Sequence, residues 1–184
     1  MKVQVVYTSL SGCTRRLAEG IYNALEVEEK SLHNLADGEP VLDGDVILLG
    51  YWVDKGGPNA QMKAFMEKVE GKTVGVFSTL AYWADSTHGH QSIVSGVDLL
   101  KDKNVILGGY VCNGCMSQEM IARFRAMGST GPHSASPESE ARWEVMANHP
   151  TACEIALGAE RFNDRLKLLK LLNERGLAYA SVHF

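Results

Sequence analysis

The chain has 184 residues, of which 45% are hydrophobic and 22% charged, a composition typical of a folded globular domain and not of a disordered or fibrous protein. Its 18 Lys and Arg against 22 Asp and Glu give a formal net charge of −4, which argues against electrostatic binding of nucleic acid. No apolar run approaches the roughly 20 residues that a membrane span needs, and the first residues are typical of a strand and not of a signal peptide. We therefore expect a cytoplasmic globular protein whose four cysteines are reduced thiols.

Four short apolar runs predict strands buried on both faces of a parallel sheet, because their apolar residues are consecutive and do not alternate with polar ones. These runs are Val3–Tyr7, Val46–Leu49, Val74–Phe77 and Val105–Cys112. A more polar run, Glu29–Leu32, predicts a further strand nearer an edge of the sheet.

Apolar residues at helical spacing lie between these strands. The four predicted helix faces consist of Leu17, Ile21, Ala24 and Leu25; of Met62, Phe65, Met66 and Val69, in a helix that opens at Pro58; of Ile93, Val97 and Leu100; and of Met120, Ile121, Phe124 and Met127. The alternation of strand and helix up to about residue 127 predicts a doubly wound α/β fold.

The remaining residues, 128–184, have a different pattern. Residues 128–137 carry almost no large apolar side chain and predict a loop. Ser136-Pro137-Glu138 is typical of a helix start, and a second helix is predicted to begin at His149-Pro150 and to end at Gly176. We therefore expect an α/β domain of residues 1–127 with a helical C-terminal extension, residues 128–184, packed on it.

The loop between the first strand and the first helix has the features of an anion site. It reads Tyr7-Thr8-Ser9-Leu10-Ser11-Gly12-Cys13-Thr14-Arg15-Arg16. Helix N–H groups and hydroxyls attract an anion there, and Gly12 lets the backbone come close to it. The loop has no lysine for a nucleotide P-loop, too few glycines for a dinucleotide fingerprint, and a Cys13 to Arg16 spacing too short for a phosphatase. A hydroxyl-rich helix cap without a ligand is the alternative.

The segment Ser9-Leu10-Ser11-Gly12-Cys13-Thr14 resembles the Ser/Thr-x-Ser/Thr-Gly-x-Thr loop of flavodoxins, which binds the 5′-phosphate of FMN. The resemblance covers residues 1 to about 127. It implies a five-stranded parallel sheet of order 2-1-3-4-5 and FMN as the cofactor.

Two further loops agree with this resemblance, because both follow strands at the edge where such a sheet binds its ligand. Gly50–Pro58 contains Tyr51 and Trp52, and Ser78–Asp85 contains Tyr82 and Trp83. The resemblance implies that Trp52 covers one face of the isoalloxazine ring and that Tyr82 or Trp83 covers the other. Thr-Leu-Ala-Tyr-Trp in the second loop and the cation of Lys55 depart from the usual flavodoxin pattern. The cofactor-binding residues it implies are Ser9, Leu10, Ser11, Gly12, Cys13, Thr14, Tyr51, Trp52, Val53, Thr79, Leu80, Ala81, Tyr82 and Trp83.

Two other motifs invite a functional interpretation. Cys112-Asn113-Gly114-Cys115 fits a redox dithiol, half of a metal site or two buried reduced thiols, and we expect the last. His88-Gly89-His90 has no carboxylate or cysteine at ligand spacing, so we expect a solvated loop and no metal site.

The function we expect is that of an FMN-binding electron carrier that donates electrons to a partner reductase, because no acid–base pair, nucleophile triad or nicotinamide fingerprint is visible. The alternative is an FMN-dependent NAD(P)H:acceptor oxidoreductase of the quinone type, with the C-terminal extension beside a substrate pocket. A cofactor-free interaction domain is a third possibility, against which the intact phosphate loop argues. The loop of residues 128–137 either borders the flavin or joins helices that only thicken the core.

Overall fold

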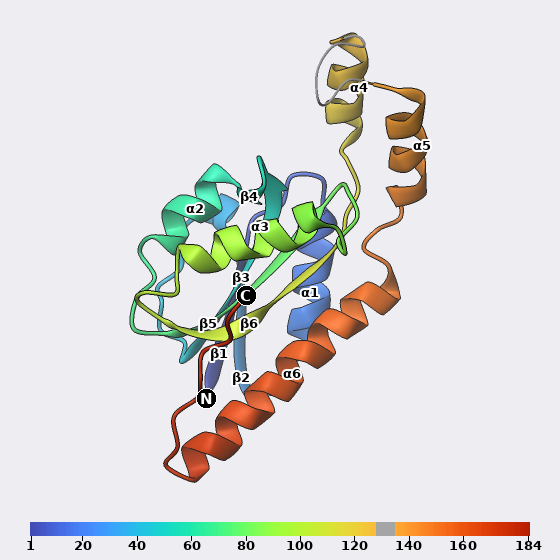
Figure 1. The fold of residues 1–184 in the computed structure, drawn as a ribbon. Coiled ribbons are helices and arrows are strands. Elements are labelled where there is room, and N and C mark those ends of the chain that lie inside the picture. The colour runs from blue at the N-terminus through green and yellow to red at the C-terminus, as the bar shows by residue number, and fades with distance from the viewer. Residues whose placement is uncertain (128–134) are drawn as a thin grey trace.

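The computed structural model describes residues 1–127 and 135–184, and its centre is a parallel sheet with helices on both faces (Figure 1). The parallel strands are β1 (Lys2–Tyr7), β2 (Glu29–Asn34), β3 (Val46–Asp54), β5 (Thr73–Leu80) and β6 (Val105–Asn113). Their order is β2-β1-β3-β5-β6. Each predicted strand is present, and the predicted doubly wound fold with its order of five parallel strands is confirmed.

A small hairpin at the end of β3 was not predicted. β3 continues to Asp54, and β4 (Gly57–Pro58) pairs with it in antiparallel orientation. The turn residues Lys55 and Gly56 have φ of 50° and 83°, as a two-residue hairpin turn requires. Because Pro58 lies in this hairpin, the prediction that the next helix opens there is wrong. That helix, α2, spans Ala60–Met66.

Two helices cover each face of the sheet (Figure 1). On one face, α1 (Cys13–Ala24) and α6 (Ala152–Glu174) share a core with β1 and β3. On the other, α2 and α3 (Thr87–Asp98) pack on β3 and β5. A short 3₁₀ helix, η1 (Leu35–Asp37), follows β2. The core therefore consists of two apolar layers, one on either side of the sheet.

The helices after β6 differ from one another in how they pack. α4 (Gln118–Ala126) and α5 (Pro137–Met146) stand away from the sheet in Figure 1, joined by the stacked rings of Phe124 and Trp143. α6 instead returns to the sheet and buries Phe162, Leu166 and Leu169. The division of the chain at residue 127 stays a prediction, but α6 contributes to the same core as α1.

The predicted starts of the last two helices have different outcomes. α5 begins after Ser136 as predicted, with a capping box between Ser136 and Ser139. α6 begins two residues later than predicted, because the side chain of Thr151 caps it and accepts from the N–H of Glu154. Of the predicted loop, residues 128–134 lie outside the described residues.

The C-terminal segment lies along the outer edge of β6. The N–H of Val182 donates to the carbonyl of Ile106 at 2.9 Å, and the hydroxyl of Tyr179 donates to the carbonyl of Leu107 at 3.0 Å. These contacts use backbone groups that an uncovered edge strand would offer to another chain.

Candidate functional site

The loop between β1 and α1 presents backbone N–H groups to open space. Gly12 is the N-cap of α1 with φ of 87°, and a Cβ atom on it would have no atom within 4 Å. The N–H of Arg15 donates to Ser9 Oγ at 3.2 Å, whereas those of Gly12, Cys13 and Thr14 have no acceptor among the described residues. Because these groups lie at the positive end of a helix dipole, the loop fits a small anion such as a phosphate group.

A pair of hydroxyls links this loop to the end of β5. Thr14 Oγ1 lies 2.9 Å from Thr79 Oγ1, and both side chains are buried. Each hydroxyl carries one hydrogen, and the bond between them uses only one. The second hydrogen is left for another acceptor. The two arginines of this turn are engaged elsewhere, Arg15 with Glu19 and Arg16 with the carbonyl of His149.

The four predicted aromatic residues fall into two groups. Trp52 is half-buried near the end of β3, paired in the sheet with Thr79, and Tyr82 and Trp83 are 37% and 43% exposed in the loop after β5. Tyr51 is fully buried and its hydroxyl donates to the carbonyl of Ser92 at 2.8 Å, so its side chain is used by the core. Three aromatic side chains thus remain at the carboxyl edge of the sheet.

The other predicted residues lie along the same edge. Leu10 is exposed, and Val53 and Ala81 are half-buried at the ends of β3 and β5. Leu80 is buried, and its carbonyl accepts from the N–H of Gly114 at 2.8 Å. The structure thus gathers the predicted residues of three loops at one edge, and their individual contacts with a cofactor stay predictions.

Two residues at this edge have no signal in the sequence. Asn113, at the end of β6, accepts from the N–H of Ala84 through Oδ1 at 2.8 Å and so holds the loop after β5. Arg142 of α5 lies 5.0 Å from the centre of the Tyr82 ring. Both act on a loop that lies about 30 or more residues away in the chain, so no local motif reveals them.

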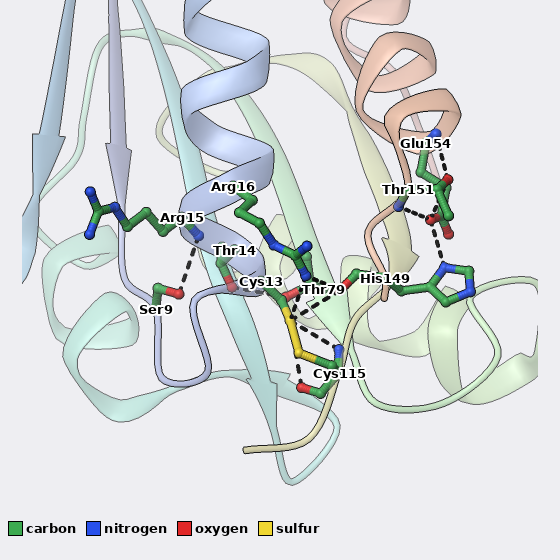
Figure 2. The surroundings of a disulfide bond; sticks show 10 residues. All are labelled: Ser9, Cys13, Thr14, Arg15, Arg16, Thr79, Cys115, His149, Thr151 and Glu154. Atoms are coloured by element: carbon green, nitrogen blue, oxygen red, sulfur yellow. Dashed lines mark hydrogen bonds and ion pairs between the residues drawn. A yellow bond between two sulfur atoms is a disulfide. The ribbon is translucent and has the colours of Figure 1, made fainter. Parts of the chain in front are cut away.

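A disulfide joins Cys13 to Cys115, 102 residues away (Figure 2). The expectation of four reduced thiols is therefore wrong for these two, and Cys112 and Cys115 do not form a dithiol pair. Cys112 is a buried free thiol, and burial raises its pKa far above the ordinary value. Cys153 is an exposed free thiol. The bond lies beside the loop of residues 8–12 between β1 and α1, which we call the anion loop, because Cys13 directly follows Gly12.

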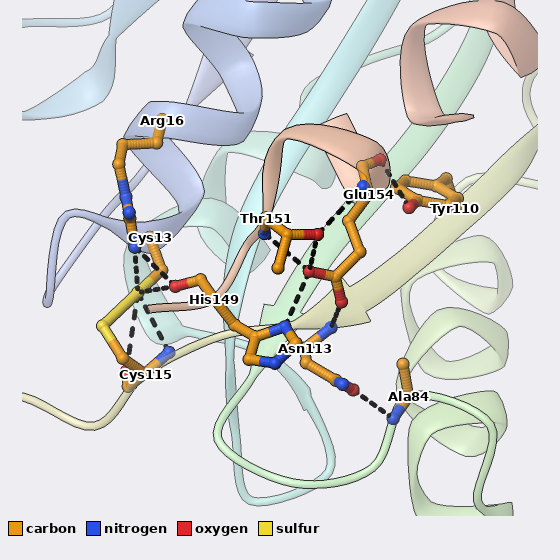
Figure 3. A network of polar contacts seen from close by, with 9 residues as sticks. All are labelled: Cys13, Arg16, Ala84, Tyr110, Asn113, Cys115, His149, Thr151 and Glu154. Carbon is orange, nitrogen blue, oxygen red and sulfur yellow. Dashed lines mark hydrogen bonds and ion pairs between the residues drawn. A yellow bond between two sulfur atoms is a disulfide. The ribbon is translucent and has the colours of Figure 1, made fainter. Parts of the chain in front are cut away.

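A polar network next to the disulfide holds the start of α6 (Figure 3). Glu154 accepts from the N–H of Thr151 at 2.6 Å, from His149 Nδ1 at 2.7 Å and from the N–H of Asn113 at 3.2 Å. Burial would raise the pKa of Glu154, but the hydrogen bonds from Thr151 and His149 outweigh it and lower the pKa. A carboxylate therefore ties the end of β6 to α6.

Two negative findings concern residues 1–127 and 135–184. In these ranges no three His, Cys, Asp or Glu side chains gather as a metal ion would need. The prediction of a loop at His88-Gly89-His90 is wrong, because these residues lie in the first turn of α3. No helix in them combines the length and apolarity needed to cross a bilayer.

Comparisons with known proteins agree with this architecture. The family model of the flavodoxin domain matches residues 4–163. The chain belongs to the flavodoxin family. The match extends beyond residue 127 and ends within α6, so this flavodoxin-domain match includes α4 and α5. The family is one of FMN-binding proteins, and membership in it supports FMN as the cofactor.

Individual relatives give the same family and fold. The flavodoxin-like domain-containing protein BilS of Clostridioides difficile (strain CD3) is 30% identical over 152 residues, which cover 81% of this chain and 84% of that protein. A flavodoxin from the domain Archaea has a TM-score of 0.59 at 15% identity, covering 92% of this chain and 99% of its own. The Fusobacterium nucleatum flavodoxin bound to flavin mononucleotide has a TM-score of 0.52 at 16% identity, with 92% and 97% covered.

Proposed function

We propose that the chain is an electron carrier that binds FMN along the carboxyl edge of its sheet. The open N-terminus of α1 at Gly12, beside strand ends that carry aromatic side chains, is the observation that supports this most. The phosphate lies on the helix N-terminus, and the ring lies between Trp52 and the aromatic pair Tyr82 and Trp83. The solved Fusobacterium nucleatum flavodoxin, which shares the fold, is described as bound to flavin mononucleotide.

The residues of the chain divide the work of binding between three loops. N–H groups of Gly12, Cys13 and Thr14 hold the phosphate, and an anion at a helix N-terminus is stabilised by about 0.3–1 kcal/mol where exposed and by more where partly buried. The free hydrogen of the hydroxyl pair Thr14 and Thr79 serves a further oxygen. Backbone groups of Val53, Thr79, Leu80 and Ala81 border the ring. When bound, FMN supplies one- and two-electron redox chemistry.

A carrier passes these electrons to a partner protein, and we propose a reductase as that partner. A quinone-type NAD(P)H:acceptor oxidoreductase is the second candidate, because Arg142 of α5 lies against Tyr82 and so places protein beside the loop that borders the ring. Such a wall would help to form a substrate pocket.

Two measurements on the purified full chain test the proposal. We expect a flavin absorption spectrum, and mass spectrometry of the heat-released cofactor should give the mass of FMN. A colourless protein that takes up no added FMN, or a cofactor with the mass of FAD, would contradict it. A carrier should not oxidise NADPH unless a partner enzyme is added. Steady oxidation of NADPH by the chain alone, with a quinone as acceptor, would favour the oxidoreductase.

A further inference from the structure

We propose that the Cys13–Cys115 disulfide is a thiol–disulfide exchange site whose opening weakens FMN binding. The exchange itself stands on the surroundings of the two sulfur atoms. Its effect on FMN rests on the proposed function.

The disulfide ties the anion loop to the end of β6 (Figure 2). Cys13 is the first residue of α1, and its N–H is one of those turned to the anion site. Cys115 follows β6 by two residues, and Gly114 allows the close approach between them. A Cβ atom on Gly114 would lie 3.0 Å from Thr79 Cβ and 3.4 Å from Cys13 Cβ. Cys13 thus belongs both to the disulfide and to the anion site, so breaking the disulfide alters the surroundings of the anion site.

The two sulfur atoms have different surroundings. Cys13 is 1% exposed, and its Sγ accepts from the N–H of Cys115 at 3.0 Å and lies 3.7 Å from Arg16 Nη2. It also lies at the N-terminus of α1, which favours negative charge. The carbonyl oxygens of His149 and Cys115 lie 3.3 and 3.7 Å from the same sulfur and oppose a negative charge. The helix N-terminus, the N–H of Cys115 and the guanidinium of Arg16 stabilise a thiolate, and on this ground we assign Cys13 as the better leaving group. Cys115 is half-buried and so is the more exposed residue of the pair, and we therefore place the attack of an external thiol on its sulfur.

This asymmetry fixes the direction of exchange. An external thiolate attacks Cys115 Sγ and forms a mixed disulfide there, while the bond to Cys13 breaks and Cys13 leaves as a thiolate. A second external thiolate attacks the outer sulfur of the mixed disulfide, and Cys115 leaves and takes up a proton. Two external thiolates are oxidised to one disulfide, and the two electrons reduce the protein disulfide to the thiolate of Cys13 and the thiol of Cys115. Glutathione represents the class of reductant.

The reduced protein, in which the disulfide is open, carries a negative charge on Cys13 that the disulfide-bonded protein lacks. A thiolate on Cys13 repels the phosphate of FMN, whereas the disulfide sulfur is neutral. Arg16 offsets only part of this charge, because its guanidinium also donates to the carbonyl of His149. Opening also frees the loop after β6 from the anion loop. We expect the repulsion between these two negative charges to lower the affinity for FMN roughly tenfold.

The first experiment counts thiols in the full chain carrying Cys153→Ser, which removes the exposed free thiol. The native protein is incubated in glutathione buffers, quenched in acid, unfolded and tagged. We expect one tagged thiol, Cys112, when oxidised and three when reduced, because the disulfide adds two. The mixed disulfide should form on Cys115. A bond that glutathione opens only after unfolding, three thiols that an oxidant cannot pair, or a mixed disulfide on Cys13 would overturn the exchange site.

The second experiment compares FMN affinity by flavin fluorescence titration. The reduced protein should bind roughly tenfold more weakly than the oxidised protein. In the same background, Cys115→Ser keeps the Cys13 thiol and should bind like the reduced protein. Cys13→Ser has neither bond nor thiolate and should bind more tightly than Cys115→Ser. Equal affinity of the oxidised and reduced proteins would refute the coupling even if a variant misfolds. Absence of FMN binding in every form would refute the coupling together with the proposed function, while the thiol count would still decide on exchange.

Discussion

Replacing Leu166 by alanine should destabilise the whole α/β domain, because α6 belongs to its core. Leu166 is 2% exposed and lies in the same apolar cluster as Leu17 of α1 and Phe77 of β5. Removing a buried leucine side chain costs its transfer free energy plus that of the cavity, about 2–5 kcal/mol. This is a large share of the roughly 5–15 kcal/mol that stabilises a typical domain. Urea unfolding of the full chain followed by circular dichroism measures the loss.

The same helix offers a matched control two residues away. Leu168 is 47% exposed, so Leu168→Ala makes the same chemical change with the same effect on helix propensity but leaves no cavity in the core. It should cost about 1 kcal/mol or less. Equal losses in the two variants, or a Leu166→Ala variant in which α6 unfolds separately while the sheet keeps its midpoint, would refute the assignment of α6 to this core.

Three further predictions concern the site. Gly12→Val forces a β-branched residue into a left-handed conformation and should abolish flavin retention, whereas Gly71→Val, with φ of 67° and equally open surroundings, should keep the normal flavin-to-protein ratio. If the ring stacks on Trp52, removing FMN should restore tryptophan fluorescence in the native protein but not in Trp52→Ala; equal recovery would place the ring elsewhere. Glu154→Gln should cost about 1–3 kcal/mol at pH 7. The stability that the lowered pKa of Glu154 supplies is lost as pH falls through that pKa. The free energies of unfolding of the native protein and of Glu154→Gln should therefore approach each other in acid. A difference between them that does not change with pH would contradict this role of the Glu154 carboxylate.

Local patterns in the sequence were sufficient for the sheet and for the place of the loop around Gly12, whose binding of an anion stays a prediction. A mostly apolar run such as Val3–Tyr7 predicts a strand covered on both faces, and the structure buries this run, Gln4 included. The loop around Gly12 was equally visible, because its hydroxyls, its glycine and the helix that follows are neighbours in the chain. The family match then confirmed the fold.

Local patterns failed where a residue is used by a distant part of the chain. Pro58 next to a helical pattern is typical of a first helical turn, yet its pairing with Val53 places it in a hairpin. Tyr51 was grouped with Trp52, but successive residues of a strand face opposite sides, and the side chain of Tyr51 lies in the core.

The amino-acid sequence by itself determined the α/β architecture and the position of the loop around Gly12 at the start of the first helix, since both follow from residues close together in the chain. Only the tertiary structure decided that α6 lies beside α1, that Arg142 reaches Tyr82 and that Cys13 pairs with Cys115 and not with any nearer cysteine. The physical reason is that contacts between residues far apart depend on how helices and strands pack. A spacing such as that of Cys112 and Cys115 records only distance along the chain.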